Sequence, residues 1–167
     1  MASCAAGVQY PHAFRPPLIH RDIKSMNVLL VASEGVPWQR ATAKLADFGM
    51  TKEQRTSTMS QMGTPLYMAP EVMSGERYTA AVDVYSLAVM LAEISLRQLP
   101  FARHRKRGYV QHRFIRHVVE GGRSELPADK AIADLVEAMW HAKPTMRLEA
   151  DEVLKRLAAL GGAAAAG

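Results

Sequence analysis

The chain has 167 residues, which is enough for one domain and short for two. Hydrophobic residues make up 49% and charged residues 22%, as in ordinary globular domains. No apolar run reaches the eighteen or so residues that a bilayer span needs, so we expect no membrane association. The amino end lacks a basic segment before an apolar core, and Cys4 has no second cysteine to pair with. We therefore expect an intracellular protein of the cytoplasm, with the nucleus as the alternative.

The formal net charge is +5, which favours phosphate-bearing partners in a general way. Four of the 21 basic residues lie in the run 103–107 (RHRKR). We interpret this run as a solvated loop, because a few basic residues without interleaved aromatic side chains do not make a nucleic-acid-binding domain. Nucleic acid is therefore not an expected partner.

The first half of the chain is rich in loops. Residues 27–32 (NVLLVA) and 42–46 (TAKLA) are predicted to be two short strands, joined by a polar loop that holds Gly35 and Pro37. The polar stretch 51–61 has nothing with which to build a core, and we predict a loop there.

The second half is predicted to be helical. Residues 80–95 are apolar almost all round behind the N-cap candidate Thr79, so this helix should be the buried axis of the domain. Three one-sided apolar stripes predict three further helices. They cover 110–119, then 132–139 behind the N-cap candidate Asp129, then 153–160, which Gly161 should end. The expected architecture is a small hairpin region packed on a helical bundle.

Three polar clusters follow one another in the chain. They are 20–27 (HRDIKSMN), 47–49 (DFG), directly after the second predicted strand, and 63–71 (GTPLYMAPE). One such triplet carries little information, but the ordered set resembles the catalytic-loop, DFG and APE motifs of the eukaryotic protein kinase family. The resemblance implies a protein kinase-like α+β fold. It covers 1–160 as the mainly α-helical carboxyl-terminal lobe with a short β-hairpin and without the amino-terminal lobe, before a Gly/Ala-rich tail at 161–167.

The resemblance also implies the chemistry of phosphoryl transfer from ATP with Mg²⁺. Asp22 would accept or orient the proton of the attacking hydroxyl, and Lys24 would place its ammonium group against the transferred phosphoryl group. Asn27 and Asp47 would supply hard oxygen ligands, which suit Mg²⁺. Leu29 would join Lys24, Asn27 and Asp47 in binding the nucleotide.

Two features favour protein substrates phosphorylated on Ser or Thr. Lys24 two positions after Asp22 is the serine/threonine pattern, and Thr64 resembles the threonine that contacts the catalytic Asp and Lys in such kinases. Trp140 and Pro144, ahead of an arginine, resemble the tyrosine-kinase-like branch.

Five residues are given structural roles by the same resemblance. His20 and Phe48 would pack together as members of an internal spine. Asp83, the acidic residue in the apolar helix, needs a buried partner and would hold the backbone of the catalytic loop. Glu71 and Arg147 would form a buried ion pair.

Arg21 suggests regulation by an upstream kinase. Kinases with an arginine at this position commonly pair it with a phosphorylated residue of the segment that here spans 47–71. The candidate phosphorylation sites are Thr56, Ser57, Thr58 and Ser60.

A kinase also needs a glycine-rich loop, a strand lysine and a helix glutamate, and the nineteen residues before His20 hold no GxGxxG and no lysine. They resemble the end of a helix, although Pro11 lies where that helix would continue. We therefore expect little or no autonomous kinase activity. An incompletely predicted gene is favoured over a truncated relative, because the catalytic residues are intact. The alternative functions are a catalytically inactive interaction module and, third, a nucleic-acid binder using 103–107.

Overall fold

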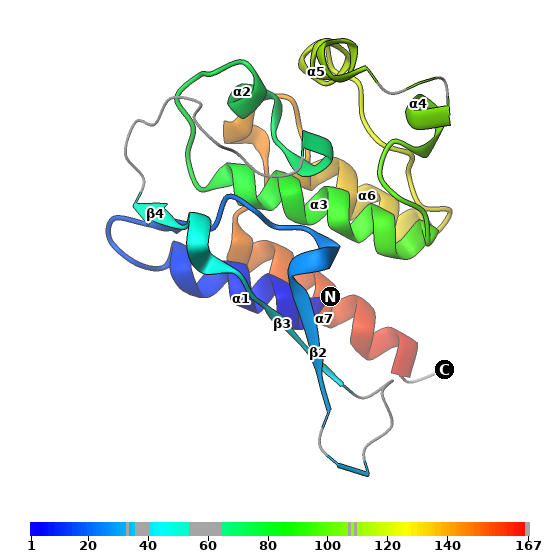
Figure 1. Cartoon of the computed structure of the whole chain (residues 1–167). Coiled ribbons are helices and arrows are strands. Elements are labelled where there is room, and N and C mark those ends of the chain that lie inside the picture. The colour runs from blue at the N-terminus through cyan, green and yellow to red at the C-terminus, as the bar shows by residue number, and fades with distance from the viewer. Residues whose placement is uncertain (33, 36–40, 54–64, 107, 109, 166–167) are drawn as a thin grey trace.

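A helix that is buried along most of its length forms the axis of the molecule. In the computed structural model this helix, α3, spans Ala81–Leu96, and every residue from Val82 to Ala92 is buried. Figure 1 shows α3 crossing the middle of the molecule, as its all-round apolar sequence predicted. The helix begins one residue later than expected, and its N-cap is Ala80 rather than the predicted Thr79. Thr79 Oγ1 still accepts a hydrogen bond from the Ala81 amide at 3.3 Å.

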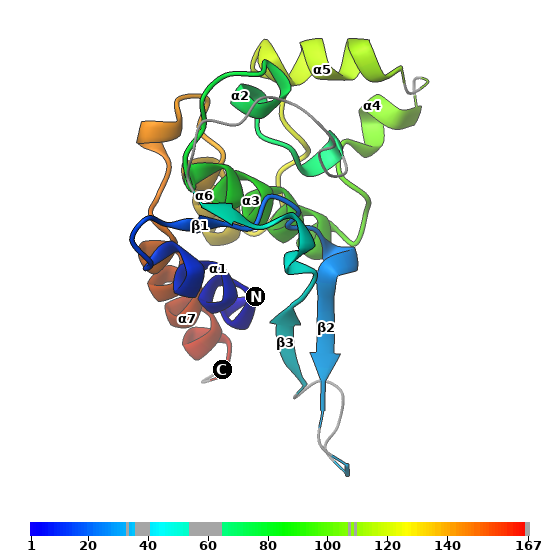
Figure 2. The same ribbon diagram turned by 60° about the vertical axis from the view of Figure 1, so that its left-hand side comes forward.

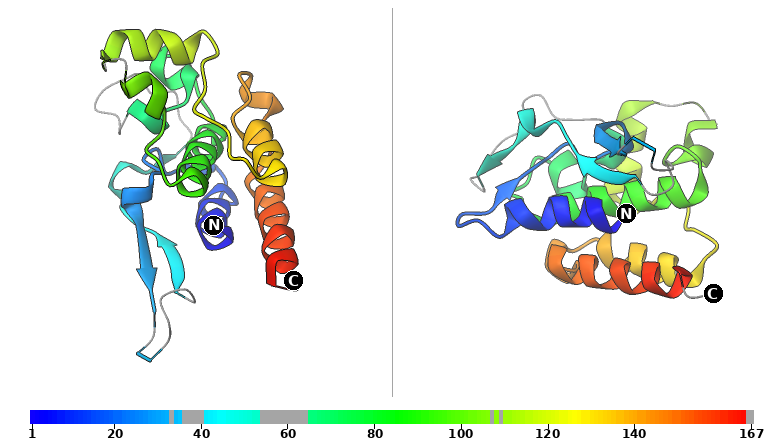
Figure 3. Two further views of the ribbon diagram at one scale, coloured as in Figure 1. Left: turned by 90° about the vertical axis from the view of Figure 1, so that its right-hand side faces the viewer. Right: turned by 90° about the horizontal axis from the view of Figure 1, so that it is seen from below.

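The other helices pack around this axis. The structure describes residues 1–32, 34–35, 41–53, 65–106, 108 and 110–165. Helix α1 contacts α7, and α6 contacts α3. Figure 3 shows α6 and α7 following one another along one side of the bundle. The bounds are α1 Ala2–His12, α2 Pro70–Met73, α4 Ala102–Lys106, α5 Gln111–Val119, α6 Lys130–Met139 and α7 Ala150–Ala165.

Two pairs of antiparallel strands complete the fold. Strands β2 (Val28–Val31) and β3 (Thr42–Leu45) form the expected hairpin, in the register Val28↔Leu45. Figure 2 shows this hairpin projecting away from the helices. The second pair joins β1 (Leu18–Ile19) to β4 (Lys52–Glu53). A mainly helical unit with a short hairpin is the fold class that the sequence predicted.

Three local expectations were wrong. The stretch 51–61 is not all loop, because β4 pairs with β1 across more than thirty residues of sequence, while 54–61 lies outside the described residues. Residues 103–106 of the basic run 103–107 are not a loop, because they belong to helix α4, and residue 107 lies outside the described residues. Helix α7 does not end at Gly161 but continues to Ala165. Each of the two glycines costs the helix about 1 kcal/mol, but neither has to end it. The alanines that follow are the best helix formers and favour its continuation.

Pro11 is accommodated close to the end of α1. The helix includes Pro11 and ends at His12, so the missing amide hydrogen affects only its last turn. Within the described ranges, no helix combines the length and the apolar character that crossing a membrane requires.

Candidate active site

The side chains of Asp22, Lys24 and Asn27 meet in one loop between β1 and β2. Lys24 Nζ donates to Asp22 Oδ2 at 2.7 Å, and Asn27 Nδ2 donates to the same oxygen at 3.0 Å. Asn27 Nδ2 also donates to the Asp22 carbonyl oxygen at 2.8 Å, which closes the loop on itself. Asp22 and Asn27 are each 9% exposed, so the carboxylate is held largely out of water by two donors.

A 3₁₀ turn, η1 (Ser25–Asn27), produces this geometry by returning Asn27 to Asp22 before β2 begins. The Ala46 amide donates to the Asn27 carbonyl oxygen at 2.8 Å, and Asp47 is the next residue. Asp47 therefore lies at the same end of the hairpin as the loop. It is exposed, has φ 62°, and accepts from the Gly49 amide at 3.3 Å. Three of the four proposed reaction residues are thus in direct contact, and Asp47 is joined to them through the backbone.

Asp83 holds the backbone at the start of this loop. Its carboxylate accepts hydrogen bonds from the amides of His20 (2.8 Å) and Arg21 (2.9 Å) and is completely buried. Arg21 has φ 69°, a left-handed conformation that costs a non-glycine residue about 1–2 kcal/mol. The two amide bonds to Asp83 offset that strain.

His12 is a partner of Asp83 that the sequence did not reveal. Its Nε2 lies 2.8 Å from Asp83 Oδ2, across 71 residues of sequence. The available signal was weak: one histidine at the end of a helix, eight positions before His20, has no periodicity that indicates a long-range contact.

His20 and Phe48 lie against one another, with ring centroids 4.7 Å apart. The His20 ring is completely buried, and its Nε2 is 3.2 Å from the Ala46 carbonyl oxygen. Phe48, in the 3₁₀ turn η3 (Phe48–Met50), is 48% exposed, so only the histidine belongs to the core. Together these contacts fix the catalytic loop to the end of β3.

Arg21 connects the loop to the segment that follows Asp47. Its Nε donates to the Met50 carbonyl oxygen at 2.6 Å, and its Nη1 donates to the Tyr78 hydroxyl at 3.4 Å. Five predicted site residues of that segment lie outside the described residues. They are Thr56, Ser57, Thr58, Ser60 and Thr64.

Glu71 and Arg147 form a two-pronged ion pair in the interior. Arg147 Nη1 and Nη2 donate to the two carboxylate oxygens at 2.6 and 2.8 Å, and both residues are 6% exposed. Arg147 also donates to the Ala81 carbonyl oxygen at 3.1 Å, at the start of α3. The Arg147 guanidinium lies 5.1 Å from the centre of the Tyr85 ring, and Tyr85 is one turn after Ala81 on α3. Burial raises the pKa of Tyr85 to about 12.

A second carboxylate of α3 reaches the loop further along. Glu93 accepts from Ser25 Oγ at 3.0 Å and from the Tyr67 hydroxyl at 2.9 Å. Tyr67 belongs to the 3₁₀ turn η4 (Pro65–Tyr67), which precedes α2. Sequence reasoning missed this cluster, because its three members come from three separate segments. It anchors the residue that directly follows Lys24.

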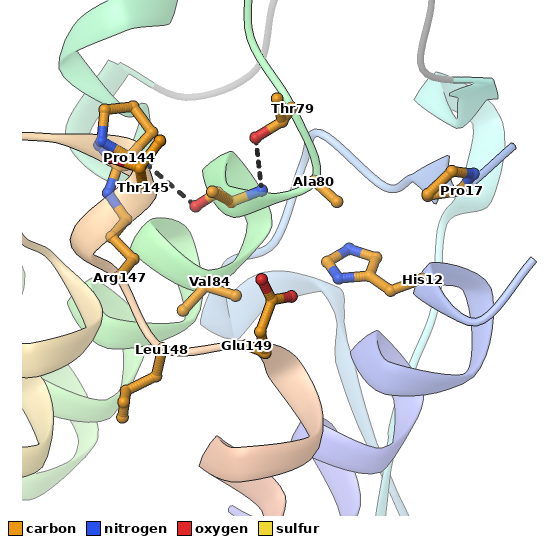
Figure 4. Close-up of a pocket in the computed structure, with 11 residues that line it drawn as sticks. His12, Pro17, Thr79, Ala80, Val84, Pro144, Thr145, Arg147, Leu148 and Glu149 are labelled. Carbon is orange, nitrogen blue, oxygen red and sulfur yellow. Dashed lines mark hydrogen bonds between the residues drawn. The ribbon is translucent and has the colours of Figure 1, made fainter.

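A cavity of about 350 Å³ lies at the start of α3. Figure 4 shows that His12, at the end of α1, and Glu149, directly ahead of α7, face this cavity. None of Asp22, Lys24, Asn27 and Asp47 lines this cavity. The candidate site is placed at the loop of Asp22 instead, because the side chains of Lys24 and Asn27 converge on the Asp22 carboxylate there.

Comparison with known families agrees with this fold and loop. A family model described as the protein kinase domain matches residues 1–157, which is nearly the whole chain. The chain belongs to the protein kinase family. Several of its relatives are named as serine/threonine-protein kinases.

Three relatives illustrate the match. A putative serine/threonine-protein kinase/receptor of Acanthamoeba polyphaga mimivirus is 35% identical over 92% of this chain and 9% of its own length. A probable serine/threonine-protein kinase of Dictyostelium discoideum is 36% identical over 90% of this chain and 11% of its own length. Mitogen-activated protein kinase kinase kinase 7 of Drosophila melanogaster is 35% identical over 86% of this chain and 20% of its own length. The chain thus spans a small part of each of these relatives.

Proposed function

We propose that this chain is the catalytic-loop lobe of a protein serine/threonine kinase, which transfers the γ-phosphoryl group of ATP to a Ser or Thr hydroxyl of a protein. One observation carries the proposal: the Asp22 carboxylate accepts hydrogen bonds from Lys24 at 2.7 Å and from Asn27 at 3.0 Å. The loop that contains these residues is bonded to Asp83 of α3 through the His20 amide. Phosphoryl transfer depends mainly on positioning and charge, and this loop positions both a base and a cation.

The two carboxylate oxygens of Asp22 have different roles. Oδ2 is engaged by Lys24 and Asn27, whereas Oδ1 forms no hydrogen bond with any residue that the structure describes. Oδ1 can therefore accept the proton of a substrate hydroxyl. The Lys24 ammonium lies one hydrogen bond away, where it would stabilise negative charge on the group being transferred.

The oxygen donors at this end of the hairpin suit a magnesium–nucleotide complex. Asn27 donates from Nδ2 within the loop, so its side-chain oxygen Oδ1 is left to serve as a ligand, and Asp47 presents an exposed carboxylate. Both are hard oxygen ligands of the kind that Mg²⁺ prefers. Leu29 is 56% exposed on β2 and offers apolar surface for a purine ring. When bound, magnesium–ATP supplies the phosphoryl group and neutralises its charge.

The test is phosphoryl transfer from labelled ATP to a Ser/Thr peptide library. We expect little transfer by the 167 residues alone, and robust transfer when a lobe with a glycine-rich loop and a strand lysine is joined ahead of Met1. In that joined form Asp22→Asn should reduce kcat by about 10²–10⁴-fold. Asp134→Asn, at an exposed carboxylate on α6, is the matched control and should leave kcat unchanged. Transfer that survives Asp22→Asn would contradict the proposed role.

A catalytically inactive interaction module is the second candidate. The hairpin favours it, because Leu29, Leu30 and Val31 are between 45% and 65% exposed and present apolar surface that a partner would cover. Absence of transfer by the joined form, with its binding of magnesium–ATP also absent, would select this alternative over the kinase.

A further inference from the structure

The positive charge of the chain is concentrated on two adjacent helices. Residues 102–119, which span α4 and α5, contain six of the 21 Lys and Arg residues and three of the six His residues. They contain none of the 16 Asp and Glu residues. Their formal charge of +6 exceeds the +5 of the whole chain, so all other residues together carry a charge of −1. The excess positive charge of the chain is therefore confined to this segment.

Packed rings hold α4 and α5 together. His104 of α4 stacks on His117 of α5 with ring centroids 4.9 Å apart, and it also contacts the Phe114 ring at 5.7 Å. Phe101, just ahead of α4, meets Phe114 at 4.9 Å. A Cβ on Gly122 would lie 2.3 Å from the His117 ring, so this ring rests directly on the glycine backbone. The run that the sequence suggested to be a solvated loop is thus fixed against a second basic segment.

The Lys and Arg side chains that the structure describes on these helices are exposed to solvent. Five residues are exposed, and we call them the α4–α5 basic face: Arg103, Lys106, His112, Arg113 and Arg116. Figures 1 and 2 show α4 and α5 together at the end of the molecule opposite the β2–β3 hairpin. The face is therefore distant from the apolar surface of the hairpin.

Other helices of the molecule neutralise their surface cations, and this face does not. Lys130 pairs with Asp134 at 2.9 Å on α6, and Lys155 pairs with Asp151 at 3.2 Å on α7. Among the described residues, no member of the basic face forms an ion pair. The nearby acid Glu125 accepts a hydrogen bond from the backbone amide of Arg103 at 2.9 Å. That bond helps to lower the pKa of Glu125, although burial opposes it.

We propose that the α4–α5 basic face binds an acidic segment of a partner protein. Val110 and Val119, at the two ends of α5, are 37% and 44% exposed, so apolar contacts are available beside the cations. The nine residues of α5 span about 13 Å, a length that four or five extended acidic residues cover.

A protein partner fits this face better than a nucleic acid does. Single strands bind on exposed aromatic platforms, and the described rings of this region pack against each other instead. The four exposed Lys and Arg side chains of the face would also give only weak, strongly salt-dependent binding to phosphate backbones. The proposal does not depend on kinase activity.

The test is a binding titration with the full chain and a fluorescein-labelled octaglutamate peptide, followed by anisotropy at about 50 mM salt, where screening is weak. Arg113→Gln/Arg116→Gln removes two cations from the face, and Lys155→Gln/Arg156→Gln removes two exposed cations from α7 as the matched control. Arg113→Lys/Arg116→Lys keeps the charge. Circular dichroism establishes that each variant is folded. A single-stranded oligonucleotide is titrated in parallel.

We expect octaglutamate binding that the glutamine pair on α5 weakens about fivefold, as two exposed ionic contacts allow. The lysine pair and the α7 pair should bind within twofold of the parent chain. Absence of octaglutamate binding would overturn the proposal, as would an equal loss in the two glutamine variants, which would show an effect of net charge alone. Tighter binding of the oligonucleotide than of octaglutamate would overturn the choice of partner.

Discussion

Replacing Asp83 tests whether α3 sets the geometry of the catalytic loop. The Asp83 carboxylate is completely buried and accepts from the amides of His20 and Arg21 at 2.8 and 2.9 Å, with His12 Nε2 a further 2.8 Å contact. Asp83→Ala leaves one buried and one partly buried backbone donor without partners, at about 1–3 kcal/mol each. It also removes what holds Arg21 at φ 69°. We expect a total loss of about 4 kcal/mol, close to the cost of breaking a buried ionic contact.

Asp83→Asn separates the two contributions. Asparagine has nearly the same volume, but its amide group turns one acceptor into a donor that faces a backbone donor. We expect this variant to lose about 2 kcal/mol of stability and to keep its fold. If Asp83→Ala does not fold, Asp83→Asn still provides the measurement.

The assay is urea unfolding followed by circular dichroism, together with amide hydrogen exchange of His20 and Arg21. Asp134→Ala is the control, because Asp134 is an exposed acid on α6 and its loss should cost less than about 0.5 kcal/mol. In the Asp83 variants the two amides should exchange faster than the rest of the core. If Asp83→Ala and the control are equally stable and both amides are still protected from exchange, Asp83 does not hold the backbone of the loop.

Three further predictions concern other polar groups that are buried or partly buried. Glu71→Ala leaves the Arg147 guanidinium buried without its partner, and thermal unfolding should show a loss of about 3–5 kcal/mol that a second change, Arg147→Met, partly restores. Tyr85→Phe should leave stability at neutral pH unchanged or higher, because within the described chain the Tyr85 hydroxyl is buried without a hydrogen-bond partner. Burial raises the pKa of Tyr85 from 10.0 to about 12, so the folded state keeps a proton that the unfolded state releases. The parent chain should therefore lose up to about 3 kcal/mol between pH 10 and 12 that Tyr85→Phe does not lose, and equal alkaline unfolding curves would contradict this. Ser25→Ala removes the 3.0 Å bond to Glu93 and should lower kcat of the lobe-joined form severalfold with KM for peptide unchanged, whereas a change in KM alone would exclude a positioning role.

Elements with local patterns were predictable from the sequence. The apolar run of α3 and the stripe of α6 behind Asp129 gave both helices to within one or two residues, since each pattern repeats every turn. The Asp129 side chain accepts from the Ile132 amide at 3.0 Å, as an N-cap does. The ordered motifs around Asp22 and Asp47 identified the family. These signals lie within short windows of the chain.

Features that depend on distant segments were not predictable in the same way. The contacts of Asp83 with His12 and of Ser25 with Glu93 cross 71 and 68 residues, and neither partner has a periodic neighbour that indicates it. Strand β4 has two residues, which is too short for an alternating pattern. Helix α4 was obscured by its charge, although its His104 packs inward on Phe114. Each of these features is set by contacts with distant parts of the chain rather than by the local sequence.

The two carboxylates of α3 together explain why Asp22 is held so closely. Asp83 and Glu93 are ten residues apart on one helix, which separates them by about 15 Å along its axis. Asp83 holds the His20 amide and Glu93 holds the Ser25 hydroxyl, and Asp22 lies between these two residues in the chain. The loop is therefore attached at two points to one helix, with Asp22 between its two anchors. Because both anchors lie within this chain, the position of the carboxylate is set before a nucleotide or a substrate arrives, which is what catalysis by positioning requires.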